Sequence, residues 1–160
     1  MAEAGKNIRY NRSEIIYPQD WEKRPVFHKE LDTRASILKL HPGITPQVVR
    51  SILCSNGPRA IIIETYGAGN APSKEWFLNL VKEAASMGKI LLNITQCIAG
   101  SVNMDIYATG KCLKDAGVAN GYDSTTESAL AKLFHLMGVS DKNKDVQKGL
   151  ENNLRGEISK

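Results

Sequence analysis

Residues 59–65 read RAIIIET, a run of isoleucines that ends on two polar side chains. β-branched residues favour strands, and a strand without alternating polar positions is typical of one that is buried on both faces. Residues 66–72, YGAGNAP, follow directly and are rich in the turn formers glycine and proline. The two segments therefore predict a central parallel strand that opens into a loop.

The same pattern continues on both sides of this strand. Strands are also expected at residues 36–40, 89–94 and, as a short piece, 118–122. Helices are expected between and after them: one capped by Thr45 with Pro46 in its first turn, one capped by Ser73, one over 107–115, one opened by a capping box at 124–127, and one over 140–154.

Alternating strands and helices are typical of right-handed crossovers in a parallel sheet. We expect an α/β fold, with a small parallel sheet of about four strands flanked by helices in a Rossmann-like three-layer arrangement. Apolar residues show no clear period in residues 1–35, which are interpreted as an interdomain linker or arm. Residues 36–160 are interpreted as the folded domain.

The composition narrows the class of protein. The 160 residues are 42% hydrophobic and 24% charged, which suits one globular domain. The net charge is +4, but acids interrupt the basic residues, so no nucleic-acid partner is expected. No apolar run reaches the length of a membrane span, and the N-terminus does not resemble a signal peptide, so no membrane partner is expected either.

The cysteines Cys54, Cys97 and Cys112 are odd in number and form no C-x-x-C pair. This pattern indicates neither a disulfide framework nor a zinc site. Reduced thiols and a cytoplasmic location are the simplest interpretation, and no metal or cofactor is expected.

Ligands of open parallel sheets gather outside the carboxyl ends of the strands. Two polar loops are expected there, residues 66–72 and 95–105. Gly67 and Gly69 invite a dinucleotide-binding interpretation, but Pro72 stands where the third glycine belongs, so a tight turn is the alternative.

A nucleophile is not evident. Cys97 has no histidine near it in a recognisable arrangement, and the acids Asp105, Asp123 and Glu127 show no paired spacing. The residues taken alone therefore predict an α/β domain with a polar loop edge and no complete catalytic set.

Several motifs go further. Residues 66–72 resemble the YGxGNAP loop of cytoplasmic-type L-asparaginases, and residues 93–102 resemble their N-x-T-Q-C…G-x-V segment. The PGI at 42–44, YATG at 107–110 and LRGE at 154–157 are similar to motifs of the same family, in the same order. The resemblance runs from about residue 37 to residue 157.

The resemblance implies the smaller C-terminal domain of such an enzyme. In that family the N-terminal domain carries two catalytic threonines, a lysine, an aspartate and a mobile loop, and this sequence matches none of it. The implied partners are that N-terminal domain, a neighbouring subunit of a homodimer or tetramer whose active site this domain completes, and L-asparagine. No catalytic residue is expected in this chain, and the isolated chain is expected to be inactive.

The family's substrate contacts map onto the loop edge. Asn70 matches the asparagine that reaches toward substrate. Many members place a glutamate after the tyrosine of YATG to hold the substrate's amino group, whereas this chain has Ala108, so Tyr107 or Asp105 would substitute.

An effector site is the second implied feature. Some bacterial relatives bind asparagine at an allosteric site through an arginine. In this sequence Glu64 stands at the position of that arginine, whereas Cys97 matches the family's residue at the edge of the same site. A carboxylate at Glu64 would repel the effector's own carboxylate. The alternative to an amidohydrolase piece is a non-catalytic small-molecule-binding or assembly module of the same fold.

Overall fold

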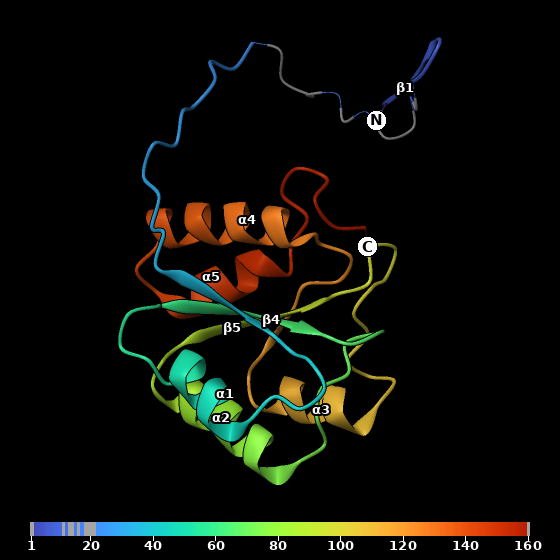
Figure 1. Cartoon of the computed structure of the whole chain (residues 1–160). Helices are drawn as coiled ribbons and strands as arrows, with labels where there is room; N and C mark the ends of the chain where they lie inside the picture. The colour runs from blue at the N-terminus through green and yellow to red at the C-terminus, as the bar shows by residue number, and fades with distance from the viewer. Residues whose placement is uncertain (1, 11, 13–14, 16, 18–21, 160) are drawn as a thin grey trace.

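The computed structural model describes residues 2–10, 12, 15, 17 and 22–159. Within them a four-stranded parallel sheet has the order β3-β4-β5-β6. Its strands are β3 (Ala35–Lys39), β4 (Ala60–Thr65), β5 (Ile90–Thr95) and β6 (Ala119–Asn120). The helices are α1 (Pro46–Leu53), α2 (Glu75–Ser86), α3 (Ala108–Asp115), α4 (Thr126–Val139) and α5 (Asn143–Leu150). Figure 1 shows α1, α2 and α3 on one face of the sheet and α4 and α5 on the other. The expected three-layer α/β fold is confirmed.

The central strand β4 is buried at every position. Ile61 and Ile63 belong to the core under α1 and α2, whereas Ala60 and Ile62 belong to the core under α4 and α5. The side chains of β5 alternate in the same way: Leu91 belongs to the core under α1 and α2, and Ile90 and Leu92 belong to the core under α4 and α5. The alternation explains why the sequence shows no polar position until the strand ends.

The start of α1 is as expected, whereas the start of α2 is not. Thr45 caps α1 as predicted, accepting a bond from the Val48 amide, with Pro46 in the first turn. Ser73 does not cap α2, because the chain stays extended until Lys74 and Glu75 begins the helix; the Glu75 carboxylate supplies favourable charge there instead.

The predicted capping box of α4 is wrong by one position. Thr125, not Ser124, is the N-cap, and its hydroxyl accepts from the Ser128 amide at 3.3 Å. Glu127 is then the second helical residue, one short of the position from which a side chain reaches back to the cap.

Residues 22–34 contain no helix or strand and lead into β3. We call these residues the arm. Further toward the N-terminus, Ala2–Ala4 (β1) pairs antiparallel with Ile8–Tyr10 (β2), a small hairpin that the sequence did not indicate. The arm is held against α4: the Asp32 amide donates to the Phe134 carbonyl at 3.1 Å, and a side chain at Gly138 would collide with the Glu30 backbone.

Arg59, at the start of β4, binds side chains and carbonyls of four segments on the α4 and α5 side of the sheet. Its guanidinium donates to the Asn143 side chain at 2.9 and 3.0 Å and to the carbonyls of Met137 and Ser140 at 3.0 and 2.9 Å. It also forms an ion pair of 3.4 Å with Asp32 of the arm. Both charged side chains are largely buried, so α4, the α4–α5 turn, the start of α5 and the arm share one cation.

The segment after α5 is fixed by a second buried pair. The Lys132 ammonium lies 2.7 Å from the Glu157 carboxylate and donates to the carbonyls of Leu150 and Asn152. Because a cation satisfies these carbonyls, α5 ends at Leu150 and not near 154 as predicted. The Glu157 carboxylate also accepts the Leu154 amide at 2.9 Å.

We expect Arg59→Met to lower the free energy of unfolding by about 3 kcal/mol, because it leaves several buried acceptors without a donor. Urea denaturation of the whole chain measures this. Arg50→Met is the matched control: Arg50 pairs with Glu83 at 2.7 Å, but both side chains are exposed, and a loss below about 1 kcal/mol is expected. Equal losses in the two variants would contradict the role given to Arg59.

Acid should weaken the anchoring of residues 151–157. Burial alone would raise the pKa of Glu157, but hydrogen bonds from Lys132 and from the Leu154 and Arg155 amides outweigh it and lower the pKa to about 2. A depressed carboxyl pKa stabilises the fold above the unfolded value of 4.5, and this contribution is lost as the pH falls toward 2. The shift corresponds to about 3 kcal/mol.

Glu157→Gln should therefore flatten the decline in stability between about pH 5 and pH 2, as followed by urea midpoints at each pH. Glu22→Gln removes an exposed carboxyl of the arm and should leave the wild-type decline in place. A Glu157→Gln protein with the full wild-type acid dependence would show that this carboxyl does not hold the segment.

Candidate functional site

The carboxyl ends of β4 and β5 open into the two loops that the sequence placed there. The loops are joined to each other, since the Asn103 amide donates to the Ala68 carbonyl at 2.9 Å. They are joined to the sheet by the Gln96 amide, which donates to the Thr65 carbonyl at 3.0 Å. The result is one continuous polar edge beside the N-terminus of α3.

The glycine loop is a closed turn. Tyr66 and Asn70 exchange two backbone hydrogen bonds of 2.8 and 2.7 Å. Gly69 has φ +100, and a Cβ added there would lie 2.7 Å from the Val102 side chain. The dinucleotide interpretation needs a helix that opens directly from the glycines, whereas α2 begins only at Glu75. The glycines therefore serve a tight turn against the second loop.

This turn presents Asn70 to the edge. Its side-chain oxygen accepts the Thr109 hydroxyl at 3.0 Å, from the first turn of α3. Among the described residues no hydrogen bond is made by the amide nitrogen of Asn70, so two donors remain for a ligand. Tyr107 is the N-cap of α3 and is 48% exposed, two positions before Thr109.

A buried polar network holds the turn from below. Asn93 is fully buried in β5; its oxygen accepts the Thr65 hydroxyl at 2.6 Å, and its nitrogen donates to the Gly69 carbonyl at 3.3 Å. The Thr95 hydroxyl donates to the Gly67 carbonyl at 2.5 Å. Sequence reasoning used these residues only as parts of a motif. Their signal is a polar side chain at the end of an otherwise apolar strand.

Asp105 lies elsewhere on the same edge. Its carboxylate pairs with Lys114 at 2.8 and 3.1 Å, and the hydrogen bond and charge of Lys114 lower the pKa of Asp105. Lys114 is in the last turn of α3, whereas Thr109, which holds Asn70, is in the first. The structure thus joins Asn70 to the start of α3 and the Asp105 carboxylate to its end.

Glu64 and Cys97 do share a pocket, of ≈ 270 Å³, beside the N-terminus of α4. Glu64 is only 7% exposed, accepts the Thr126 hydroxyl at 2.5 Å and pairs with Lys39 at 3.2 Å. Cys97 is exposed, and its amide donates to the Thr95 hydroxyl. The pocket therefore contains a fixed carboxylate that is already satisfied by neighbours.

The described residues contain no group of three or more histidine, cysteine or acidic side chains placed to hold a metal ion. In the same part of the chain no helix is both long and apolar enough to cross a bilayer. Cys54, Cys97 and Cys112 are free thiols, and burial raises the pKa of Cys54.

Comparison with known proteins agrees with this architecture. Residues 34–150 match the glutaminase/asparaginase C-terminal domain. The chain is 36% identical over 159 residues to L-asparaginase 1 of Escherichia coli K12, covering 99% of this chain and 46% of that protein. It is 36% identical over 160 residues to the human 60 kDa lysophospholipase, of which it covers 27%.

A solved structure is similar over the same span. The L-asparaginase I of Vibrio cholerae superposes with a TM-score of 0.86 and 37% identity, covering 99% of this chain and 47% of that one. The chain thus spans about half the length of the asparaginases it matches.

Two substitutions test whether the turn is set by contact with the second loop. Gly69→Ala should destabilise the fold by about 2 kcal/mol or more, because it combines a strained φ with a collision against Val102. Gly67→Ala, at φ +50 and with open space around it, should cost only about 1 kcal/mol. Thermal melting of both variants measures the difference, and equal costs would remove the argument for close loop packing.

Proposed function

Because the chain belongs to the glutaminase/asparaginase C-terminal domain family, we propose that it forms the C-terminal part of an enzyme that hydrolyses L-asparagine to L-aspartate and ammonia. In this proposal its loop edge completes an active site whose nucleophile lies on another domain. The observation that carries the proposal is Asn70, held by Thr109 with its amide nitrogen free at the open edge.

No histidine in the described residues is placed to activate a nucleophile, which supports a reaction whose nucleophile lies on another domain. His28 and His135 contact each other, and the Nδ1 atom of His41 lies 3.0 Å from the Pro42 carbonyl oxygen. None of them hydrogen-bonds to a cysteine, serine or threonine that the structure describes. The Thr126 hydroxyl does donate to the Glu64 carboxylate at 2.5 Å, but this pair lies in a pocket that Asn70 does not line. A nucleophile needs an adjacent base, and the proposal therefore takes the attacking group from outside these residues.

Exposed apolar side chains indicate where a partner would dock. Ile98 at the tip of the second loop is fully exposed, and Ile106 and Tyr107 are 57% and 48% exposed near Asn70. Side chains of this kind on loops at a polar edge are typical of a surface that is buried in an assembly. They suit the nucleophile-bearing N-terminal domain of a neighbouring subunit in a homodimer or tetramer, and we place that assembly in the cytoplasm.

In this assembly the Asn70 amide donates to the substrate's carboxylate, and Tyr107 borders the same space. Asp105 would bind the substrate's amino group only after exchanging Lys114 for it. This competition, together with Ala108 in place of a glutamate, favours the second candidate function, a small-molecule-binding or assembly module without chemistry.

A chimera separates the two candidates. This chain replaces the matching C-terminal segment of L-asparaginase 1 of Escherichia coli, and ammonia release from L-asparagine is measured. We expect activity in the chimera and none in the isolated chain. In the chimera Asn70→Ala should lower kcat/KM by about tenfold or more with little change in melting temperature, because a substrate contact is lost.

Asn56→Ala is the control, since it removes an exposed amide from the turn before β4, at the opposite edge of the sheet. It should leave kcat/KM unchanged. A folded, oligomeric chimera without ammonia release would favour the non-catalytic module. Activity of the carefully purified isolated chain would contradict the proposal that the nucleophile lies elsewhere.

A further inference from the structure

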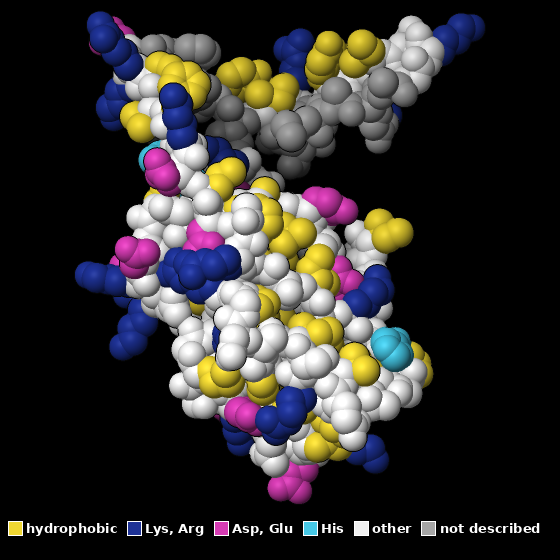
Figure 2. All heavy atoms as spheres, turned by 60° about the vertical axis from the view of Figure 1, so that its left-hand side comes forward, with side chains coloured by type: hydrophobic (Ala, Val, Ile, Leu, Met, Phe, Trp, Pro, Cys, Tyr) yellow, Lys and Arg dark blue, Asp and Glu magenta, His cyan; other side chains and the backbone are white. Residues whose placement is uncertain are grey.

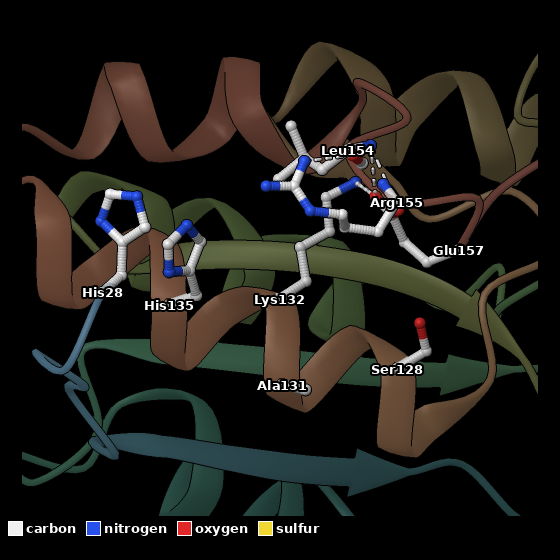
Figure 3. Close-up of a pocket in the computed structure, with 8 residues that line it drawn as sticks. All are labelled: His28, Ser128, Ala131, Lys132, His135, Leu154, Arg155 and Glu157. Carbon is white, nitrogen blue, oxygen red and sulfur yellow. Dashed lines mark hydrogen bonds and ion pairs between the residues drawn. The ribbon is translucent and has the colours of Figure 1, made fainter. Parts of the chain in front are cut away.

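A separate cavity of ≈ 500 Å³ lies on the outer face of α4, on the opposite side of the sheet from α3 and Asn70. Figure 3 shows its three walls: the arm with His28, the helix α4 with Lys132 and His135, and the C-terminal segment with Arg155. Figure 2 shows the adjoining arm and body with exposed hydrophobic and basic side chains side by side. Its volume falls within the range of small-molecule sites.

The charges that line the cavity do not balance. Glu157 is the one acidic residue among the described lining residues, and its carboxylate is already taken by Lys132 and by the amides of Leu154 and Arg155. The Arg155 side chain is left with a single hydrogen bond, 2.7 Å to the Leu154 carbonyl, and the structure describes no ion pair for it. One guanidinium charge is thus in excess.

The direction of Arg155 makes this charge usable. In Figure 3 its guanidinium extends from the C-terminal segment over Lys132 toward the two imidazoles. A guanidinium offers a planar fork of donors that matches the oxygens of a carboxylate or a phosphate. An anion in the cavity would therefore meet directed donors and not only a diffuse positive field.

The remaining walls suit an apolar body. The rings of His28 and His135 pack edge to face, with centroids 5.1 Å apart, and form one wall. Ala131 and the side chain of Leu154 add aliphatic surface to the lining of the cavity. A ligand that places its charge on Arg155 can lay its carbon chain against these groups.

We propose that this cavity binds a small organic anion, with a carboxylate or phosphate head on Arg155 and a short apolar chain against the histidine wall. Because the arm and the C-terminal segment both line the cavity, such a ligand would bridge two segments that are far apart in sequence. The proposal does not depend on the amidohydrolase function, since it uses none of the residues at the carboxyl edge.

Titration of the whole ¹⁵N-labelled chain tests it, with hexanoate and hexyl phosphate as the two anionic probes and 1-hexanol as the neutral one. We expect saturable shifts of the amides around 128–135 and 154–157 with at least one anion, and about tenfold weaker binding of hexanol. The probe that binds more tightly identifies the head group. Lack of saturation with both anions, or equal binding of hexanol, would overturn the proposal.

Two variants test whether the anion binds in this cavity. Arg155→Gln should weaken binding of the preferred anion by about tenfold, and Ala131→Trp, which fills the cavity, should abolish it. Both residues are exposed, so the fold should persist, and the amide spectrum verifies this. Lys148→Gln removes an equal charge from α5, outside the cavity, and should leave the dissociation constant unchanged. If it weakens binding as much as Arg155→Gln does, the anion is held by net charge alone and the site is disproved.

Discussion

Burial of β4 on both faces is the constraint on which the other layers depend. Every residue of this strand is enclosed, and its side chains alternate between two separate cores, so neither helical layer can be removed without exposing isoleucine. Its backbone is paired on both sides as well, with β3 and with β5. Polar groups can then gather only where the strand ends, at Glu64 and Thr65. The position of the polar edge follows from this enclosure.

Local patterns in the sequence were sufficient to predict the layers of this fold. Unbroken apolar runs identified the strands, and Thr45 with Pro46 identified the start of α1, because each signal lies within a few residues of the element it describes. The starts of α2 and α4 were misplaced because capping depends on where the chain turns, and several polar residues near Ser73 and Ser124 could serve. Arg59 carried no local signal, since its partners lie in the arm and at residues 137–143.

The arrangement of the candidate site could be predicted in part, whereas its function stays a prediction. The rule that ligands gather at the carboxyl edge, together with the family motifs, named Asn70 as a candidate and placed Glu64 and Cys97 at one edge, where they line one pocket. It could not identify Thr109 as the partner of Asn70, or Lys114 as the partner of Asp105, because these contacts depend on how α3 approaches the loops. That approach is set by Gly110, where a side chain would lie 2.7 Å from the Met104 carbonyl.

The attachment of the arm has a mechanical consequence. Asp32 is bonded through its amide to α4 and through its carboxylate to Arg59 at the start of β4, and the arm backbone lies directly on Gly138. A load applied to the arm would therefore be shared by α4, by the start of β4 and by β3, and the edge strand would not bear it alone. Residues 30–32 are therefore the point at which the arm is clamped to the folded body.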